Sequence, residues 1–365
     1  MQIREITQFI ESIAPLAFQE GYDNSGLIIG RQDDEISGVL ITLDITEDII
    51  DEAISKKLNL ILSHHPILFS GLKKFNDSNY IERCVAKAIK NDIAIYAAHT
   101  NLDSVFGGVN SKICEKLNMQ NCKMLVHKQN FLKKLVTFVP IADAEKVRTA
   151  LFEAGAGNIG NYDSCSFNQT GTGSFKGNES THPYAGEKNK LHFEEETRIE
   201  TIFPKQIQNR IVEALLKSHP YEEVAYDIYP LDNEFPLGGT GMIGELAEPM
   251  EELHFLEKLK EIFNCKVVKY TRLLGKPIKK IAVCGGSGSS FLSKAIAQNA
   301  DIYISGDFKY HQFFDAENRI IIADIGHYES EQFTKEVFYE LLTKKFPKFA
   351  VQLSGISTNP VNYLI

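Results

Sequence analysis

The feature that most restricts the fold of this chain is an alternation of apolar strands and helical segments in two separate stretches. In the first stretch, the runs GVLITLDI (38–45), LNLILSHH (58–65) and DIAIYAAHTNLD (92–103) are separated by segments long enough for a helix. Thr46 can cap the first of these helices, with Glu47 and Asp48 in its first turn. Connections of this length join parallel strands, because antiparallel neighbours need only a tight turn.

The second stretch, near the C-terminus, repeats the pattern. KKIAVCGG (279–286), DIYISGDF (301–308) and RIIIADIGH (319–327) have the composition of strands, and residues 329–346 have the periodicity of one long amphipathic helix. We therefore expect an α/β fold whose two-lobed core contains mainly parallel, mixed sheets.

The middle of the chain has a different order of elements. Residues 133–155 indicate a strand, a turn and a helix, and the polar stretch 168–196 indicates a long hairpin or loop. A strand, a helix and a final strand follow, which is the order of an α+β ferredoxin-like domain. We expect an inserted domain at 131–233, between two halves of the α/β core at 1–130 and 234–365.

Composition narrows the functional class. The chain has 365 residues, 43% of them hydrophobic, and a formal net charge of −9, which disfavours nucleic-acid binding. The chain contains neither an apolar run long enough to span a bilayer nor a signal-peptide pattern at its N-terminus. The six cysteines are scattered without a CxxC pair, so we expect reduced thiols and a cytoplasmic protein.

Ligand-type side chains follow the expected strands in both stretches. His64 and His65 end one strand and precede Pro66, which favours a turn there. Such side chains also occur at 99–103, at 306–307 and at 326–327, each just after an apolar run. Ligands of open α/β sheets bind beyond the carboxyl ends of the strands, so these positions predict a shared site.

Each pair of these residues also has a plain structural interpretation. The two adjacent histidines could be surface or core residues, Asp103 could stabilise a turn, and Glu331 could cap a helix beside a solvated His327. Three pairs at the ends of strands together favour a metal site. Imidazole and carboxylate ligands without thiolate suit Zn²⁺, Mn²⁺, Fe²⁺, Co²⁺ or Ni²⁺.

Three further features have less specific meanings. His99 and His311 are candidates for a position behind the ligands or for proton transfer, or are ordinary structural histidines. The turn Gly285–Gly288 could hold an anion with its backbone N–H groups, but it matches neither a Walker A motif nor a dinucleotide-binding motif, which favours a plain tight turn.

The motifs DNSGL (23–27), LSHHPILFSG (62–71), AAHTNLD (97–103), ISGD (304–307) and IGHYESE (325–331) resemble those of the GTP cyclohydrolase 1 type 2 homologues. These proteins are also called Ngg-one-interacting-factor-three-like proteins, or dinuclear-metal-centre hexameric proteins. The resemblance covers about two thirds of the chain, and HPYEEVAYDIYPL (219–231) is typical of the PII/CutA-like domain inserted in long bacterial members.

The resemblance implies two divalent metal ions per subunit and a toroidal homohexamer with its metal sites facing an internal cavity. It implies that the ions are bound by five residues, with Glu331 able to bridge: His64, His65, Asp103, His327 and Glu331. The function that we expect is a metal-dependent hydrolase of a nucleotide or phosphorylated heterocycle. The alternatives are a regulatory or binding protein without turnover, and a nucleic-acid-binding ring, which the acidic charge disfavours.

Overall fold

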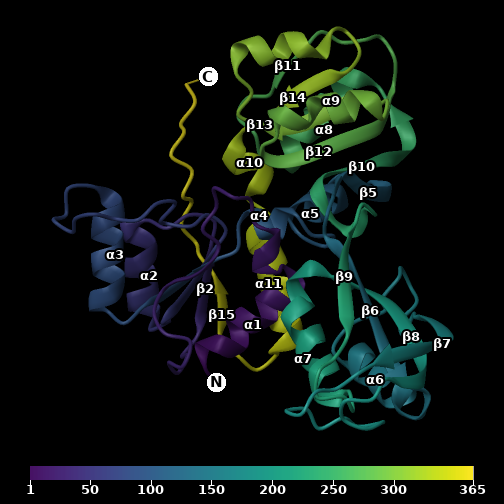
Figure 1. Ribbon diagram of the computed structural model, residues 1–365. Helices are drawn as coiled ribbons and strands as arrows, with labels where there is room; N and C mark the ends of the chain where they lie inside the picture. Colours follow the sequence, from purple (N-terminus) through teal and green to yellow (C-terminus); the bar gives the residue numbers. More distant parts are fainter. Residues whose placement is uncertain (365) are drawn as a thin grey trace. The chain divides into compact units, whose positions relative to one another are not determined.

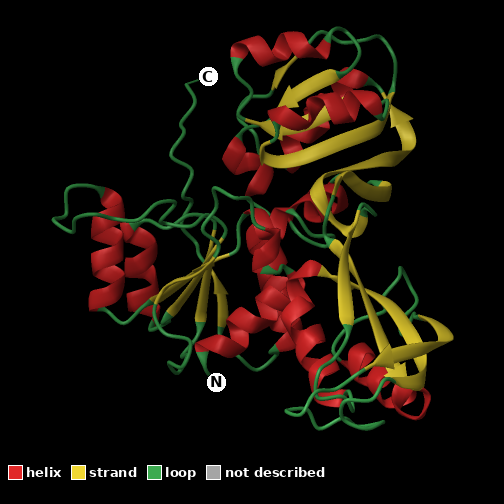
Figure 2. Cartoon of the chain, in the orientation of Figure 1, coloured by secondary structure: helices red, strands yellow, loops and turns green. Residues whose placement is uncertain are grey.

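The computed structural model describes residues 1–364, which form two compact units. Unit 1 contains Met1–His127 and Leu237–Ile365, and unit 2 contains Lys128–Pro236. Unit 1 is a mixed α/β structure with two sheets, and unit 2 has one sheet of its own (Figures 1 and 2).

The first sheet of unit 1 has five strands in the order β1-β4-β3-β2-β15. The strands β15, β2, β3 and β4 run parallel to one another, and the edge strand β1 is antiparallel to β4. Their bounds are β1 Gly26–Ile29, β2 Val39–Thr42, β3 Leu60–Ser63, β4 Ala94–Ala97 and β15 Val351–Leu353. Every residue of β2, β3 and β4 is buried, as expected for parallel strands covered on both faces.

Helices cover both faces of this sheet, as Figure 2 shows. The helices α2 (Glu47–Lys56) and α3 (Tyr80–Lys90) pack together on one side, and α1 (Ile3–Ile13) and α11 (Thr334–Lys345) lie on the other. The predicted cap of α2 is confirmed, because Thr46 Oγ1 accepts a hydrogen bond from the Ile49 N–H at 3.4 Å. The short η1 helix (Leu16–Phe18) follows α1.

The second sheet of unit 1 has six strands in the order β11-β14-β13-β12-β10-β5. The central strands β12, β13 and β14 are parallel, and β10 and β11 are antiparallel to their neighbours β12 and β14. The bounds are β5 Gln120–Lys128, β10 Phe235–Met250, β11 Lys269–Tyr270, β12 Ile278–Ser287, β13 Ile302–Gly306 and β14 Ile321–Asp324. The short helix α4 (Thr100–Asp103) follows β4 of the first sheet and contacts η1 and α5. The other helices of unit 1 are α5 Val109–Lys116, α8 Glu252–Ile262, η4 Ser289–Phe291, α9 Leu292–Ala297, η5 Tyr310–Ala316 and α10 His327–Glu331.

Unit 2 has the element order β6-α6-β7-β8-α7-β9, with an antiparallel sheet in the order β7-β8-β6-β9. Its core lies between α6, α7 and one face of the sheet, and includes Leu135, Leu151, Phe203 and Leu215. The polar stretch after residue 168 forms the hairpin of β7 and β8. The bounds are β6 Leu132–Pro140, η2 Ile141–Asp143, α6 Ala144–Glu153, β7 Phe167–Phe175, β8 His192–Pro204, η3 Lys205–Ile207, α7 Gln208–Ser218 and β9 Tyr226–Leu231.

The expectation of one helix over residues 329–346 was wrong. The structure has the short α10 and the longer α11, with a break at Gln332 and Phe333. The side chain of Gln332 donates from Nε2 to the backbone oxygens of Phe263 at 2.7 Å and Glu329 at 3.0 Å, and these bonds hold the chain at the break. The chain that follows the inserted unit forms the long strand β10.

In the described part of the chain, no helix is both long and apolar enough to cross a membrane. All six cysteines are free thiols, four of them buried.

Unit 1 is discontinuous in sequence, yet its chain leaves and re-enters at neighbouring points, because β5 and β10 are adjacent in one sheet. We predict that replacing residues 129–235 with a short Gly-Ser linker leaves a folded unit 1, since few structural elements are interrupted. Circular dichroism and a single cooperative thermal transition check this result. A truncated chain without cooperative unfolding contradicts it.

Candidate metal centre

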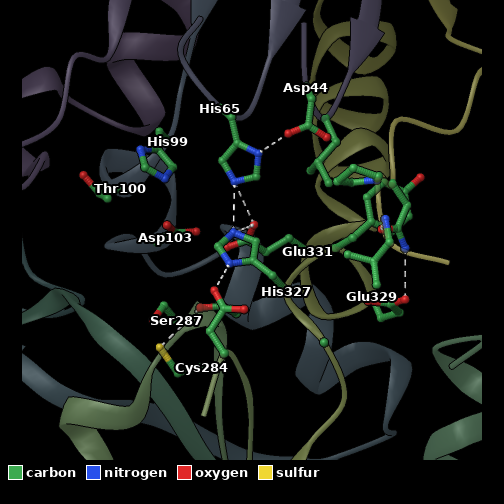
Figure 3. A pocket seen from close by; sticks show the side chains of 18 of the residues that line it. Asp44, His65, His99, Thr100, Asp103, Cys284, Ser287, His327, Glu329 and Glu331 are labelled. Atoms are coloured by element: carbon green, nitrogen blue, oxygen red, sulfur yellow. Dashed lines mark hydrogen bonds and ion pairs between the residues drawn. The ribbon is translucent and has the colours of Figure 1, made fainter. Parts of the chain in front are cut away.

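Unit 1 contains a cavity of about 910 Å³ at the carboxyl ends of its parallel strands. Four of the five predicted ligands line it, and Figure 3 shows their side chains converging: His65, Asp103, His327 and Glu331. His64 is fully buried and reaches the same cluster from behind this lining. The structure therefore brings all five predicted residues together.

Local backbone structure places the two adjacent histidines. The strand β3 ends at Ser63, and the backbone N–H groups of His64 and His65 both donate to the oxygen of Leu43, at 3.2 and 3.0 Å. This turn ends the strand alternation that would send the two side chains to opposite faces. Both imidazoles consequently reach the cluster.

Glu331 lies at the centre of the cluster, and each of its carboxylate oxygens faces a different group. Its Oε1 is 3.6 Å from His64 Nε2, which is 3.7 Å from Asp103 Oδ1. Its Oε2 is 3.0 Å from His65 Nε2 and 3.1 Å from His327 Nε2. The five side chains thus form two groups of three potential ligands that share Glu331.

Glycines make room for the Glu331 side chain. Gly286 has a φ of +63°, and a Cβ there would collide with Glu331 Oε1 and lie 3.1 Å from its Cδ. The N–H of Gly286 also donates to Ser330 Oγ at 2.9 Å, which ties the turn to α10. The turn at Gly285–Gly288 therefore packs against a candidate ligand.

A second polar atom orients each imidazole. His65 Nδ1 lies 2.7 Å from Asp44 Oδ1, a contact drawn in Figure 3 as a dashed line. His327 Nδ1 lies 2.7 Å from Asp307 Oδ2. His64 Nδ1 donates to the backbone oxygen of Ala98 at 2.9 Å. Such bonds leave Nε2 of each ring directed at the cluster, as in many histidine metal ligands.

The carboxylates of the site favour positive charge on two of its histidines. Burial alone would lower the pKa of His65. The neighbouring carboxylates of Asp44 and Glu331 outweigh this effect and raise the pKa to about 10. Burial would also lower the pKa of His327, but the carboxylates of Asp307 and Glu331 raise it to about 11. The Nε2 atoms of these two rings are only 3.3 Å apart, so both rings approach the same side of Glu331.

The other half of the cluster is more deeply buried. Burial and the neighbouring Glu331 raise the pKa of Asp103 well above its usual value, whereas burial lowers the pKa of His64. Burial opposes ionisation of Glu331, but the surrounding histidines hold its pKa well below the usual value.

Three buried ligand atoms have no hydrogen-bond partner among residues 1–364: His64 Nε2, Asp103 Oδ1 and Glu331 Oε2. A buried polar atom without a partner is costly, and in native structures it generally has a bound water or ion nearby. His64 Nε2 lies 3.7 Å from Asp103 Oδ1 and 3.6 Å from Glu331 Oε1, so these residues fit a divalent cation.

The two histidines proposed for proton transfer differ in position. His99 lines the cavity, and its Nδ1 lies 2.8 Å from Asp23 Oδ1. Burial tends to raise the pKa of Asp23, but hydrogen bonds from His99, Thr100 and Ser25 hold it below its usual value. His311 is exposed, packs against Tyr310 and Phe314, and does not line the cavity, so the structure does not bring it to the cluster.

Sequence reasoning placed Asp307 at the shared site without naming its partner, and it gave no role to the other two carboxylates that orient the histidines, Asp23 and Asp44. Asp44 lies two residues after the end of β2, and this position near a strand end is the signal that could have identified it. The C-terminal segment was also missed. Asn359 and Tyr363 line the cavity, and the nearby Thr358 donates from Oγ1 to Asp44 Oδ2 at 2.5 Å.

Comparisons with known proteins show which family the chain resembles. The family model described as Duf34/NIF3 (NGG1p interacting factor 3) matches residues 1–360. A protein of Halalkalibacterium halodurans named GTP cyclohydrolase 1 type 2 homolog is 40% identical over 364 residues, covering 98% of both chains. A Bacillus subtilis protein of the same name is 39% identical and covers 99% of this chain and 98% of its own.

Solved structures show the same similarity. The crystal structure of a Bacillus cereus protein related to NIF3 matches with a TM-score of 0.85 at 39% identity, covering 100% of this chain and 99% of that one. A Staphylococcus aureus protein matches with a TM-score of 0.80 at 28% identity and the same coverage. The match over nearly the whole chain shows that this protein belongs to the Duf34/NIF3 family.

Proposed function

We propose that unit 1 binds two divalent metal ions that share Glu331. One ion would be held by His64 and Asp103 with Glu331, and the other by His65 and His327 with Glu331. The observation that carries this proposal is the division of one buried carboxylate between two groups of nitrogen and oxygen ligands. The ligand set suits Zn²⁺, Mn²⁺, Fe²⁺, Co²⁺ or Ni²⁺.

The activity that fits such a centre is hydrolysis of a nucleotide or a related phosphorylated heterocycle. Paired divalent ions lower the pKa of bound water and polarise the group under attack. The cavity of about 910 Å³ is large enough for such a substrate, and the exposed rings of Tyr22 and Phe69 offer flat surfaces for a heterocycle. Lys269 also lines the cavity, and its positive charge can attract a phosphate. Its Nζ forms an ion pair with Asp324 Oδ2 at 2.5 Å, which partly offsets this charge.

His99 is the side chain of this cavity that we assign to proton transfer. Asp23 fixes the His99 ring through Nδ1, which leaves Nε2 available. The centroid of the His99 ring lies 5.2 Å from the ring centroids of His64 and His65. The names of the relatives, GTP cyclohydrolase 1 type 2 homolog, support a purine nucleotide as the first substrate to test.

Three further features belong to the same proposal. The chain assembles as a toroidal homohexamer, acts in the cytoplasm, and carries unit 2 as a PII/CutA-like insert at about residues 131–233. The element order and the antiparallel sheet of unit 2 support the last point.

A second candidate function is regulation or ligand binding without turnover. The specific observation that favours it is a separate cavity of about 610 Å³ within unit 2. In that case the metal centre would be structural or would store metal.

Selective loss of metal tests the assignment of the ligands. We predict two ions per chain for the wild type, about one for Asp103→Asn and for His327→Ala, and none for Glu331→Gln, because only Glu331 belongs to both groups. Inductively coupled plasma mass spectrometry of metal-loaded, desalted protein measures these values. Glu329→Gln is the matched control, since Glu329 is also buried in α10 but is absent from both groups. Equal metal content in Glu331→Gln and wild type contradicts the assignment.

A backbone substitution provides an independent test. We predict that Gly286→Ala lowers metal affinity at least about tenfold, because its Cβ would displace the Glu331 carboxylate from the shared position. Gly275→Ala is the control, since Gly275 has a similar φ of +72° but no atom within 4 Å of a Cβ. Competition with a chromophoric chelator measures the affinities, and similar values for the two variants would argue against this role of Gly286.

Turnover tests the hydrolase proposal itself. We expect metal-loaded protein to convert GTP or another member of a nucleotide and phosphoester panel, with loss of activity in His65→Ala and in chelator-treated protein. Liquid chromatography with mass spectrometry identifies the products. If no compound is converted by wild type at micromolar concentration, or if His65→Ala is equally active, the hydrolase proposal is wrong and the binding function is favoured.

A further inference from the structure

Unit 2 contains a cavity of about 610 Å³ that is separate from the metal centre and made only of unit 2 residues. It lies on the sheet face opposite α6 and α7. The core residues Ile199 and Phe203 of β8 point toward the helices, whereas Glu196 and Arg198, which alternate with them, line the cavity. The strand β7, at the edge of the sheet, forms another wall (Figure 1).

Glu196 is a buried carboxylate at this cavity, with 8% of its surface exposed. Its Oε1 accepts a hydrogen bond from the Tyr221 hydroxyl at 2.8 Å. Its Oε2 has no hydrogen-bond partner among the residues that the structure describes, and no cationic side chain pairs with it there. An unpartnered carboxylate oxygen at a cavity can accept a charge-assisted hydrogen bond, so this position is suited to a cationic ligand.

The backbone beside Glu196 accommodates its carboxylate. A Cβ at Gly173 of β7 would collide with Oε2 and lie 2.7 Å from Cδ of Glu196. The absence of a side chain at Gly173 therefore allows Glu196 to lie flat against the strand within the cavity.

Aromatic rings surround the same position. The Tyr221 ring lies 5.6 Å from that of Phe175 and 6.0 Å from that of Tyr184, measured between centroids, and all three line the cavity. Tyr221 is held by its own N–H, which donates to His219 Nδ1 at 3.1 Å, and Tyr184 by its hydroxyl, which donates to Asp143 Oδ2 at 3.1 Å. Aromatic faces attract organic cations, particularly where water is excluded.

The charges around the cavity favour a cation over an anion. Arg198 forms an ion pair with Glu200 at 2.8 Å, a carboxylate that Lys134 also contacts at 3.0 Å, and Lys176 is exposed to solvent. Glu222 and Glu223, which are also exposed to solvent, add two carboxylates to the lining. Burial lowers the pKa of the nearby His219, so this ring adds no positive charge at neutral pH.

We propose that this cavity binds a small organic amine in its ammonium form, with an apolar or aromatic body. The ammonium N–H would donate to Glu196 Oε2, and the rings of Phe175, Tyr184 and Tyr221 would surround the charge and the body of the ligand. The site is independent of the metal centre, and it would allow unit 2 to sense an amine whether or not unit 1 is catalytic.

Isothermal titration calorimetry of the full chain with two matched probes tests this site. We expect 2-phenylethylammonium to bind at least about tenfold more tightly than 2-phenylethanol, which has a similar size but no charge. Glu196→Gln should remove this preference while leaving the thermal unfolding temperature unchanged, because glutamine can still accept from Tyr221. Glu195→Gln is the control, since Glu195 is the exposed neighbour on the opposite face of β8.

Tyr184→Leu provides a second variant with little risk to folding, because Tyr184 is 58% exposed. It should weaken binding of 2-phenylethylammonium about three- to tenfold through loss of the cation–π contact. The proposal is overturned by equal affinity for the two probes, by absence of binding at millimolar concentration, by unchanged selectivity in Glu196→Gln, or by inorganic phosphate competing with the ammonium probe. None of these outcomes depends on metal content or turnover, so they leave the proposed function of unit 1 untouched.

Discussion

The structure of the site depends on one buried carboxylate that contacts ligands on both sides. Glu331 is 2% exposed, and an isolated anion at this depth would be strongly unfavourable. The imidazoles on either side of Glu331 offset the cost of burying its charge. Cations bound between the imidazoles and the carboxylate would offset the same cost. His65 and His327 are in turn fixed by Asp44 and Asp307, so a carboxylate stands behind each imidazole that faces Glu331 Oε2. Removal of Glu331 therefore affects both halves of the cluster together.

The two sheets of unit 1 explain how residues from distant parts of the sequence meet. Parallel strands place the residues that follow them at one edge, so His65 after β3 and Asp103 after β4 become neighbours. The second sheet supplies His327 after β14 in the same way. Gly286, at the end of β12, completes the arrangement because a larger residue would occupy the space of the Glu331 carboxylate.

Sequence reasoning reached the α/β class, the cap at Thr46 and the meeting of five ligand-type residues, because these follow from local periodicity and from the ends of parallel strands. It did not reach the break before α11, which depends on a hydrogen bond from Gln332 to the distant Phe263. It also could not separate His99 from His311: both are histidines near strand ends, and only the tertiary structure places one in the cavity and the other on the surface. The pairing of Glu196 with Tyr221 was invisible for the same reason.

The most direct test of the shared carboxylate is anomalous X-ray diffraction from crystals of the protein loaded with Mn²⁺ or Zn²⁺. The account predicts two anomalous peaks in each chain, one beside His64 and Asp103 and one beside His65 and His327, with one oxygen of Glu331 bound to each. A single peak, or two peaks of which only one contacts Glu331, would contradict it.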